Sequence, residues 1–467
     1  MTTDVGALVL TAGIVADAAG GRVVSGRAET AFDTVSTDTR SITPGALFIA
    51  LRGDRFDGQT FVEEALARGA AGLLVSGHVA NPGQAAVVHV PDTLIGLQRL
   101  AREVRRRSTA RVVAITGSAG KTTTKEMTAE LLGARYRVFR NRGNLNNHIG
   151  LPLSLLELRH DVDVAVVEFG MNHAGEIRTL VGIAEPDIRV WTNVGDAHIG
   201  FFGSREAVAD AKAEILEQAS PGAVVVLNAD DPLVMARAAG FAGRRITFGE
   251  SAQASVRASS VVEYGLAGTH ADVETPAGRL QLTARLPGRT QLLNVLAAIA
   301  VAAELDVPLG AIAARVNAFQ PLSRRGAMQA TPHGAYVVDD SYNASPAAMR
   351  AMLAALAVTP TGGRRIAVLG EMLELGGNAR ALHADCGRAA ASARVDELVI
   401  VGGPAADGLA EGAEAAGVPR AHIHRFADSL AAAPIVAGLV VRDDLVLVKG
   451  SRGTRTDLIV DRLMEVA

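Results

Sequence analysis

The feature that most constrains the fold is a glycine-rich segment at residues 116–122, which reads TGSAGKT. An apolar run at 112–115 precedes it, and a helical pattern with Met127, Leu131 and Leu132 on one face follows it. The order of strand, glycine turn, Lys-Thr and helix is typical of a loop whose backbone N–H groups bind phosphate. Such a loop joins a parallel strand to its crossover helix, so it predicts an α/β domain built on a parallel sheet.

The residues of this loop have distinct expected roles. Lys121 is expected to reach the terminal phosphates of ATP or GTP, and the Thr122 hydroxyl to ligate magnesium. The standard spacing has a glycine where Ile115 stands. A plain glycine turn with an incidental lysine is therefore the alternative. The predicted nucleotide-binding residues of the loop are Gly117, Ser118, Ala119, Gly120, Lys121, Thr122 and Thr123.

A small mixed α/β domain is predicted at residues 1–108. The whole chain has 467 residues, more than a single hydrophobic core normally supports. This first part combines a helical stretch at 61–68 with short apolar runs and polar loops. A basic stretch at 105–109 marks its end, and a solvated helix end explains that charge better than a nucleic-acid site. The apolar runs lie at 46–51, 71–75 and 86–90.

Residues 109–323 predict a central ATP-binding domain. Its apolar runs are too short for helices and alternate with helical stretches, as in a parallel sheet with crossover connections. Residues 251–286 have the pattern of antiparallel strands instead, and helices are expected at 206–218 and 291–304. The expected parallel strands lie at 112–115, 162–167, 188–192 and 223–227.

Residues 324–467 predict a third domain, with a Rossmann-like, doubly wound α/β fold. Alanine-rich helical stretches alternate there with apolar runs. The expected architecture is thus α/β with three domains: a small mixed domain, a P-loop-type parallel sheet and a Rossmann-like domain. The apolar runs of the third domain lie at 335–338, 366–369, 398–401 and 445–448.

Charge and composition exclude several classes of protein. The formal net charge of −3 gives no general attraction to nucleic acid or to anionic membranes. No apolar run reaches the roughly 18 to 20 residues that a membrane span needs. The single cysteine, Cys386, cannot form an internal disulfide and fits a reducing compartment. We therefore expect a cytoplasmic, globular protein. A monomer is expected as well, although nothing in the composition decides the oligomeric state.

Polar residues also follow the other strands of the central domain, at the sheet edge where ligands bind. Glu168 comes directly after an apolar run, and a buried carboxylate needs a cation or a hydrogen-bond donor. Magnesium would satisfy it, and so would a helix cap or an ion pair. His198 follows the third strand, where a lone histidine is more often structural than a metal ligand. Residues 228–231 follow the fourth strand and equally fit a turn.

Lysine is scarce in this chain. Of 46 Lys and Arg residues only four are lysines, namely Lys121, Lys125, Lys212 and Lys449. Because a surface cation is usually arginine here, a lysine indicates a position where guanidinium would not serve. A lysine that remains by chance on a solvated helix face is the alternative, above all for Lys212.

Together these segments resemble the Mur ligases, the ATP-dependent enzymes that build the peptidoglycan stem peptide. The resemblance covers essentially the whole chain and includes the order of its three domains. Besides the phosphate loop, it rests on Glu168 with Gly170 and Asn172, on residues 193–198, on Lys212 in AKAE and on Asn294 in LLNVLAA.

The resemblance implies roles for individual residues. The catalytic set would be Lys121, Glu168, His198 and Lys212, with Thr122 and Glu168 on one magnesium ion. Lys212 would be carbamylated and would hold a second magnesium with His198. Carbamylation requires a neutral amine, which arginine does not offer. Asn294 would contact adenine, Asp340 would contact the nucleotide, and Arg325 is the best candidate for the arginine that reaches the γ-phosphate.

Within the family, the chain resembles most the branch that adds D-alanyl-D-alanine to UDP-N-acetylmuramoyl-tripeptide. Residues 36–40 and 44–48 resemble the UDP-binding end, and residues 144–150 the loop that receives the substrate peptide. Residues 339–346 and 370–376 are characteristic of this branch, and the Asp-Asn-Pro-Arg signature of the diaminopimelate-adding relative is missing. The substrate-binding residues implied are Ser36, Asp38, Arg40, Asn144, Asn146, Asn147, Tyr342, Asn343, Lys449, Ser451 and Arg452.

The expected reaction starts from three small molecules: ATP, UDP-MurNAc-tripeptide and D-alanyl-D-alanine. An acyl phosphate of the tripeptide would form first and would then be attacked by the dipeptide amine, giving UDP-MurNAc-pentapeptide, ADP and phosphate. Another Mur ligase step, a folylpolyglutamate-synthetase-type ligase and a nucleotide-dependent switch without ligation are the alternatives. The separate N-terminal domain argues against the synthetase, and a switch would leave Glu168, His198 and Lys212 without a purpose.

Overall fold

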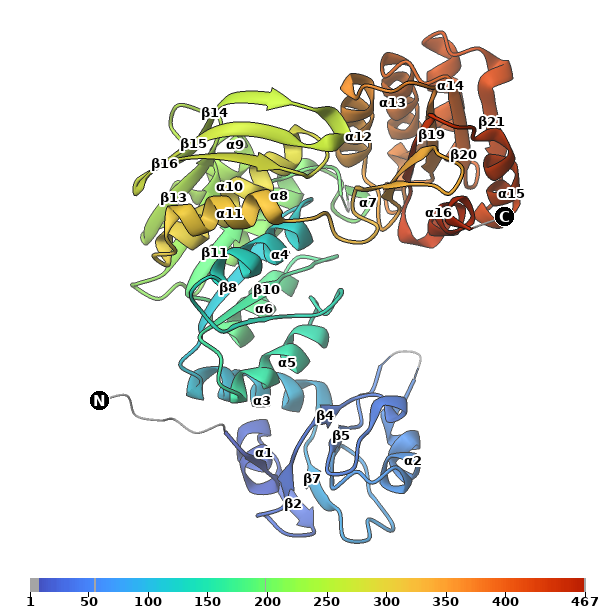
Figure 1. The fold of residues 1–467 in the computed structure, drawn as a ribbon. Helices are drawn as coiled ribbons and strands as arrows, with labels where there is room; N and C mark the ends of the chain where they lie inside the picture. Colours follow the sequence, from blue (N-terminus) through green and yellow to red (C-terminus); the bar gives the residue numbers. More distant parts are fainter. Residues whose placement is uncertain (1–7, 54–55, 198, 466–467) are drawn as a thin grey trace.

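The computed structural model describes residues 8–53, 56–197 and 199–465. Figure 1 shows the N-terminal part below, the central part in the middle and the C-terminal part above and to one side. Each part contains its own β-sheet with helices against it, so the expected α/β class and the three-part order are confirmed. No helix among these residues is both long and apolar enough to cross a bilayer.

The N-terminal part is a mixed five-stranded sheet. Four strands are parallel, and β2 is antiparallel to its neighbour β7. The apolar runs of the sequence form its buried strands, while helices α1 (Ala12–Ala19) and α2 (Val62–Ala67) pack against it. In spatial order the strands are β2 (Arg22–Ser25), β7 (Ala86–His89), β6 (Gly72–Val75), β5 (Leu47–Ile49) and β4 (Val35–Ser36).

Helix α3 (Thr93–Arg107) links the N-terminal and central parts. Its apolar face packs on α1 and also on α5 (Gly150–Leu155) and α6 (Glu176–Ala184). The basic residues at its end are paired: Arg105 donates to the Ala184 carbonyl and to Asp187. The prediction of a solvated helix end holds for Arg106 and Arg107, whose side chains are about half exposed, whereas Arg105 is enclosed against the central part. The predicted boundary at residue 108 stays a prediction.

The central part is a nine-stranded sheet whose phosphate-loop strand β8 lies near one side. The first six strands of the domain are parallel neighbours; the short apolar runs predict four of them, and the strands at 138–140 and 244–249 were not predicted. The predicted antiparallel strands extend the same sheet, because β14 joins β13 in parallel and β15 and β16 follow antiparallel. The order is β16 (Gly278–Ala284), β15 (Thr269–Thr275), β14 (Val256–Glu263), β13 (Arg244–Gly249), β12 (Val224–Asn228), β11 (Ile188–Trp191), β8 (Arg111–Thr116), β10 (Val164–Glu168) and β9 (Val138–Arg140).

Two helices cover one face of this sheet. Helix α4 (Lys121–Leu132) buries Met127, Leu131 and Leu132, as its pattern predicts. It packs on α10 (Arg289–Glu304), which is buried along most of its length. On the other face, α8 (Arg205–Ala213) ends five residues before the predicted end at 218, because a 3-10 turn follows in which buried Glu214 accepts the N–H groups of Gly175 and Arg178.

The C-terminal part is a six-stranded sheet with helices on both faces. All pairs are parallel except β17 with β18, so the predicted Rossmann-like arrangement holds. Helices α12 (Pro346–Val358), α13 (Ala379–Ser392) and α14 (Asp407–Ala415) lie on one face, and α15 (Ser429–Leu439) and α16 (Asp457–Met464) on the other. The order is β17 (Ala327–Ala330), β18 (Tyr336–Asp340), β22 (Leu445–Lys449), β19 (Arg365–Gly370), β20 (Glu397–Val401) and β21 (Ile423–Phe426).

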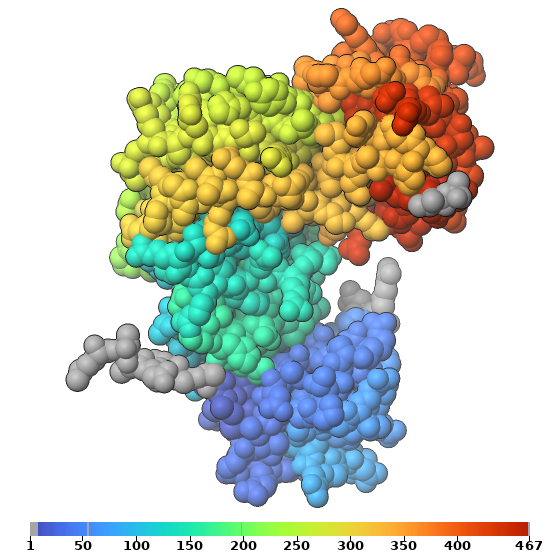
Figure 2. Space-filling model, in the orientation of Figure 1, coloured from blue at the N-terminus to red at the C-terminus, as the bar shows by residue number. Residues whose placement is uncertain are grey.

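The central and C-terminal parts contact each other beside the carboxyl ends of their strands. The short helix α7 (Ile199–Phe202) lies against the turn at 376–378, and the Gly200 N–H donates to the Glu374 carbonyl over 3.2 Å. A Cβ atom at Gly200 would lie 2.7 Å from that oxygen, so the contact requires glycine. Figure 2 shows the C-terminal part seated on the central part, and the N-terminal part at the opposite end.

Candidate active site

The phosphate loop connects β8 to α4 and needs glycine at two positions. Gly117 and Gly120 have φ angles of 154° and 81°. A Cβ atom on Gly117 would lie 1.9 Å from Thr192 Oγ1, and one on Gly120 would lie 2.0 Å from Asn294 Oδ1. The loop therefore lies directly on the neighbouring strand and on helix α10, with the N-terminus of α4 facing the cavity. This is the geometry of an anion site.

Two hydrogen bonds hold the phosphate loop in place, one from the loop to the end of the neighbouring strand and one within the loop. The Ala119 N–H donates to Asn193 Oδ1 over 2.9 Å, and Lys121 Nζ donates to the Gly117 carbonyl over 2.9 Å. Burial, together with the nearby Arg325 cation, lowers the pKa of Lys121, while the Glu168 carboxylate opposes that shift. An anionic ligand would favour the charged amine, so Lys121 is poised to respond to phosphate.

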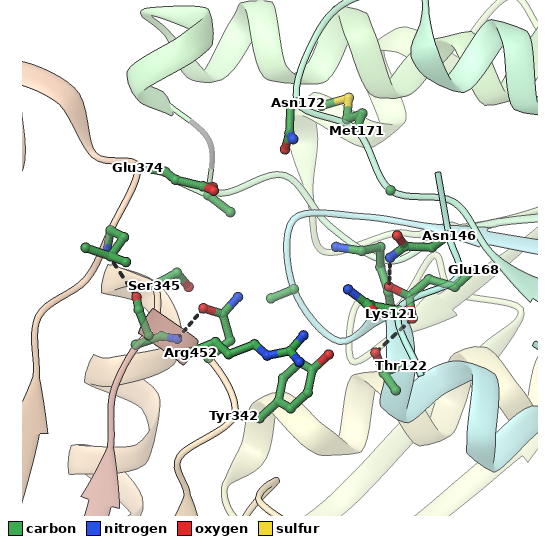
Figure 3. Close-up of a pocket in the computed structure, with 18 of the residues that line it drawn as sticks. Lys121, Thr122, Asn146, Glu168, Met171, Asn172, Tyr342, Ser345, Glu374 and Arg452 are labelled. Carbon is green, nitrogen blue, oxygen red and sulfur yellow. Dashed lines mark hydrogen bonds between the residues drawn. The ribbon is translucent and has the colours of Figure 1, made fainter. Parts of the chain in front are cut away.

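Glu168 ends β10 with its side chain 4% exposed. Thr122 Oγ1 donates to one carboxylate oxygen and Asn146 Nδ2 to the other, each over 2.8 Å (Figure 3). The backbone N–H of Glu168 donates to Asn141 Oδ1. A hydroxyl and a carboxylate at the mouth of a phosphate loop fit magnesium, which takes one or two protein oxygens and completes its shell with phosphate and water. No group of three or more His, Cys, Asp or Glu side chains suited to a metal occurs among the described residues.

Lys212 lies on α8, and its side chain is 1% exposed. Burial, and next to it the positive charge of Lys121, lower the pKa of Lys212 well below its usual value. The solvated-face alternative is therefore wrong for this lysine. His198, its expected partner at the second metal, lies outside the described residues.

A cavity of about 560 Å³ opens between the central and C-terminal parts. Figure 3 shows Lys121, Thr122, Asn146 and Glu168 on one side of it and Tyr342, Arg452 and Glu374 on the other. The cavity brings most of the predicted substrate residues together. Those that line it are Asn144, Asn146, Asn147, Tyr342, Asn343, Ser451 and Arg452.

Asn147 also has a structural task, because its Oδ1 accepts the Gly150 N–H at the start of α5. Arg325 and Arg452 lie 4.1 and 5.9 Å from the centre of the Tyr342 ring. Arg325 faces the cavity, whereas its neighbour Arg324 pairs with Asp457, so the structure puts Arg325 at the junction.

A second cavity of about 330 Å³ adjoins the first at the phosphate loop. Its walls include Asn294 from α10 and an apolar strip of α12 formed by Ala347, Ala348, Ala351 and Met352. Asp340 and Lys449 end adjacent parallel strands there and form an ion pair of 2.6 Å. Lys449, predicted to bind substrate, thus lies beside Asp340 in the cavity next to the phosphate loop. Its apolar wall is suited to a base, with polar groups around it.

The predicted UDP residues lie elsewhere. Ser36, Asp38 and Arg40 cluster on the N-terminal part, and neither cavity includes them. Arg40 makes a two-pronged contact with Asp38 and holds the pKa of that carboxyl at about 2. The Ser36 hydroxyl donates to the Asp38 carbonyl.

Several residues at the site have no predicted role. Asn141 is fully buried beside Glu168, while Asn172 and Glu374 line the larger cavity. Asn141 follows the short strand β9, which the apolar pattern does not reveal, so its position was not predictable. Residues 228–231 form the predicted turn, in which Asp231 caps the next helix.

Comparison with known proteins agrees with this arrangement. Three family models match in succession: the Mur ligase family catalytic domain at residues 32–105, the Mur ligase middle domain at 115–302 and the Mur ligase glutamate ligase domain at 324–452. Together they span most of the chain. The chain belongs to the Mur ligase family.

Within the Mur ligases, the chain is similar over nearly its whole length to ligases named for one reaction. The UDP-N-acetylmuramoyl-tripeptide–D-alanyl-D-alanine ligase of Bacillus subtilis is 34% identical over 94% of each chain. The crystal structure of MurF from Acinetobacter baumannii has a TM-score of 0.89 at 31% identity, covering 99% of this chain and 100% of that one. MurF from Thermotoga maritima, solved in complex with ADP, has a TM-score of 0.80 at 29% identity, over 92% and 97% of the two chains.

Proposed function

We propose that this Mur ligase joins D-alanyl-D-alanine to UDP-MurNAc-tripeptide at the expense of ATP. The observation that supports it best is the meeting, at one cavity, of the phosphate loop, Glu168 and the two C-terminal segments typical of this branch. The similarity to ligases named for this reaction extends over nearly the whole chain. ATP is the nucleotide we assign, with the base in the second cavity near Asn294 and Asp340.

In the first step the terminal carboxylate of the tripeptide attacks the γ-phosphorus of ATP. The bond from that phosphorus to the β-bridging oxygen breaks, and ADP leaves with the electron pair. Lys121 and the loop N–H groups bind the phosphates, and Arg325 lies where it can neutralise charge on the transferred group. The asparagines at 144–147 orient the incoming peptide at the edge of the same cavity.

In the second step the dipeptide amine attacks the acyl carbon. The C–N bond forms, inorganic phosphate leaves with the electron pair of the C–O bond, and the amine loses its proton to solvent or a nearby base. The dipeptide enters from the C-terminal side, where Arg452 offers a cation for its carboxylate. Closing the two parts around the cavity shields the acyl phosphate from water.

Magnesium suits the donors present. Thr122 and Glu168 would hold one ion beside the phosphates, where it would neutralise charge on the transferred group. We assign a second magnesium to His198 and a carbamylated Lys212. The lowered pKa of buried Lys212 supports this assignment, because it provides the neutral amine that adds to CO₂.

A product assay tests the proposed function. The protein is mixed with ATP, D-alanyl-D-alanine and UDP-MurNAc-tripeptide containing either lysine or diaminopimelate at the third position, and the products are weighed by mass spectrometry. We expect a pentapeptide with at least one of the two substrates, together with equimolar phosphate. If phosphate appears without pentapeptide, or a dipeptide amine is not accepted, another Mur ligase step or a folylpolyglutamate-type reaction replaces this one.

We place the reaction in the cytoplasm, where ATP and UDP-linked precursors are found, and expect a monomer. The near-neutral charge balance and the buried free thiol of Cys386 fit that compartment.

A further inference from the structure

Lys125 is a buried cation that the reaction described above does not use. It lies one helical turn after Lys121 on α4, with its side chain 1% exposed. It lines neither of the two cavities described above. A charged amine is costly to bury unless it is paired and hydrogen-bonded. Because this chain uses arginine for 42 of its 46 Lys and Arg residues, a buried lysine indicates a position that specifically needs an ammonium group.

Its ammonium is held by two partners. Lys125 Nζ donates to the Asn141 carbonyl over 2.7 Å and lies 3.1 Å from a carboxylate oxygen of Glu126. Glu126 pairs in turn with Arg140, the residue before Asn141. The phosphate-loop helix is therefore held against residues 140–141 at the end of β9, shortly before the substrate-peptide loop at 144–150.

Asn141 links Lys125 to Glu168, because it contacts both residues. Its side chain is fully buried, and its Oδ1 accepts the backbone N–H of Glu168 over 3.1 Å. Its Nδ2 donates to the Leu145 carbonyl over 3.0 Å, across the turn of the substrate-peptide loop. One side chain thus fixes both the strand end that carries Glu168 and the loop that carries Asn146.

Asn146, on the substrate-peptide loop, contacts Glu168 and the segment that follows it. Its Nδ2 donates to the Glu168 carboxylate, and its carbonyl accepts the Gly170 N–H over 2.9 Å. A Cβ atom on Gly170 would lie 2.9 Å from the Asn146 side chain, so the two segments are in direct contact. We infer that Lys125 is a positioning residue: through Asn141 it sets the place of Glu168 and of the substrate-peptide loop relative to the phosphate loop.

Arginine would not serve in this position. The compact ammonium fits between one carbonyl and one carboxylate, whereas a planar guanidinium needs more space and more acceptors. Changing the partners that orient a ligand of a metal typically costs about 10- to 100-fold in affinity or activity. The same range is expected when Lys125 is removed.

The test compares Lys125→Met, which keeps the length of the side chain, with Arg315→Met. Arg315 also ties α4 to a neighbour through a carbonyl, that of Glu130, but at the far end of the helix. We expect Lys125→Met to raise the KM for UDP-MurNAc-tripeptide and lower kcat, each by roughly tenfold, with the KM for ATP within about twofold. Arg315→Met should leave all three unchanged. An equal rise in both KM values, or no change in either, would overturn the inference.

Hydrogen exchange provides a readout that does not depend on the ligase reaction, whereas the kinetic arm rests on the proposed function. Amides of residues 141–147 and 168–170 should exchange at least about tenfold faster in Lys125→Met and in Asn141→Ala than in the wild type or Arg315→Met. Asn141→Ala keeps the lysine and serves if the first variant does not fold. Faster exchange in a protein that makes no pentapeptide would keep the positioning role and remove the function; unchanged exchange would refute the role itself.

Discussion

At the scale of single residues, burial determines which protonation state of a side chain is favoured at the site. Lys212 is almost fully enclosed, and both burial and the adjacent Lys121 cation disfavour its charge. At a solvated surface, lysine and arginine exchange easily, but the carbamate that we propose for Lys212 requires the neutral amine. Arginine stays charged at any accessible pH.

Replacement of Lys212 therefore has a specific expected result. Lys212→Ala should lower ligase activity by at least about 100-fold, and a small carboxylate such as formate should restore part of it by occupying the space of the carbamate. Lys212→Arg should lose the activity without being restored. The measurement is initial rate against formate concentration. Equal recovery of both variants, or of neither, would contradict the carbamate.

His383 leads to a pH-dependent prediction. It is fully buried, its Nε2 accepts the Met372 N–H and its Nδ1 contacts the Ala379 carbonyl. These partners select the neutral ring, and burial lowers the pKa of His383 despite two opposing contacts. The unfolded state therefore binds the proton more readily than the folded state does. The contribution of the neutral His383 ring to the free energy of unfolding is fully present above the usual pKa of about 6.5, and it is lost as the pH falls toward the lower pKa of the folded protein.

Urea unfolding checks this sign. Between about pH 7.5 and about pH 5.5, the wild type should lose more free energy of unfolding than His383→Gln, whose profile should be flatter. The variant should be less stable at the higher pH, since a flexible glutamine does not hold its acceptor oxygen and its donor in the places of the two ring nitrogens. A steeper profile in the variant would show that the ring is protonated in the folded protein.

At the scale of elements, the phosphate loop depends on close backbone approach. A methyl group on Gly117 would collide with Thr192, at a φ angle that favours glycine. Gly117→Ala should therefore weaken ATP binding by at least about tenfold in titration calorimetry, because the N–H groups leave their places. Gly203→Ala is the matched control, since Gly203 also has positive φ but has open space around it. Comparable losses in both would point to backbone strain alone.

Sequence patterns predicted the elements that carry a strong local signal. The strands beside the phosphate loop are short, apolar and bounded by turns, and the structure has them within two residues of the predicted ends. Strands β9, β17 and β21 were not predicted, because they are short or partly exposed and lack a clear apolar pattern. Their stability comes from neighbours distant in sequence. The contacts of Asn141 with Lys125 and with Glu168 were not predicted for the same reason: each joins residues 16 or more positions apart, and nothing local marks it.

At the scale of the whole molecule, the tasks are divided among three bodies. The N-terminal cluster at Ser36, Asp38 and Arg40 lies outside the two cavities that the central and C-terminal parts enclose. A long substrate such as UDP-MurNAc-tripeptide can bridge that separation, with its nucleotide at one end and its reacting carboxylate at the other. ATP has no need to reach the N-terminal part.

Substitution in the N-terminal cluster should therefore affect one substrate only. If Arg40 binds the UDP end of the substrate, as proposed, Arg40→Ala should raise the KM for UDP-MurNAc-tripeptide by about tenfold, because a charge-assisted contact is lost, and leave the KM for ATP within about twofold. Arg27→Ala is the control, as Arg27 is an equally exposed arginine of the same part. Steady-state kinetics with each substrate varied in turn gives both values. A parallel rise for ATP would show that the N-terminal cluster acts on the whole site.

The enclosed positions of the four lysines, three of them buried and one at the cavity, have a consequence beyond catalysis. Lys125, Lys212 and Lys449 are at most 3% exposed, and Lys121 faces the cavity between two parts. An endoprotease that cuts only after lysine meets hidden bonds in the folded chain, three in the central part and one in the C-terminal part. The order in which its fragments appear thus records which of the two parts opens first, and nucleotide in the cavity should delay the central cuts.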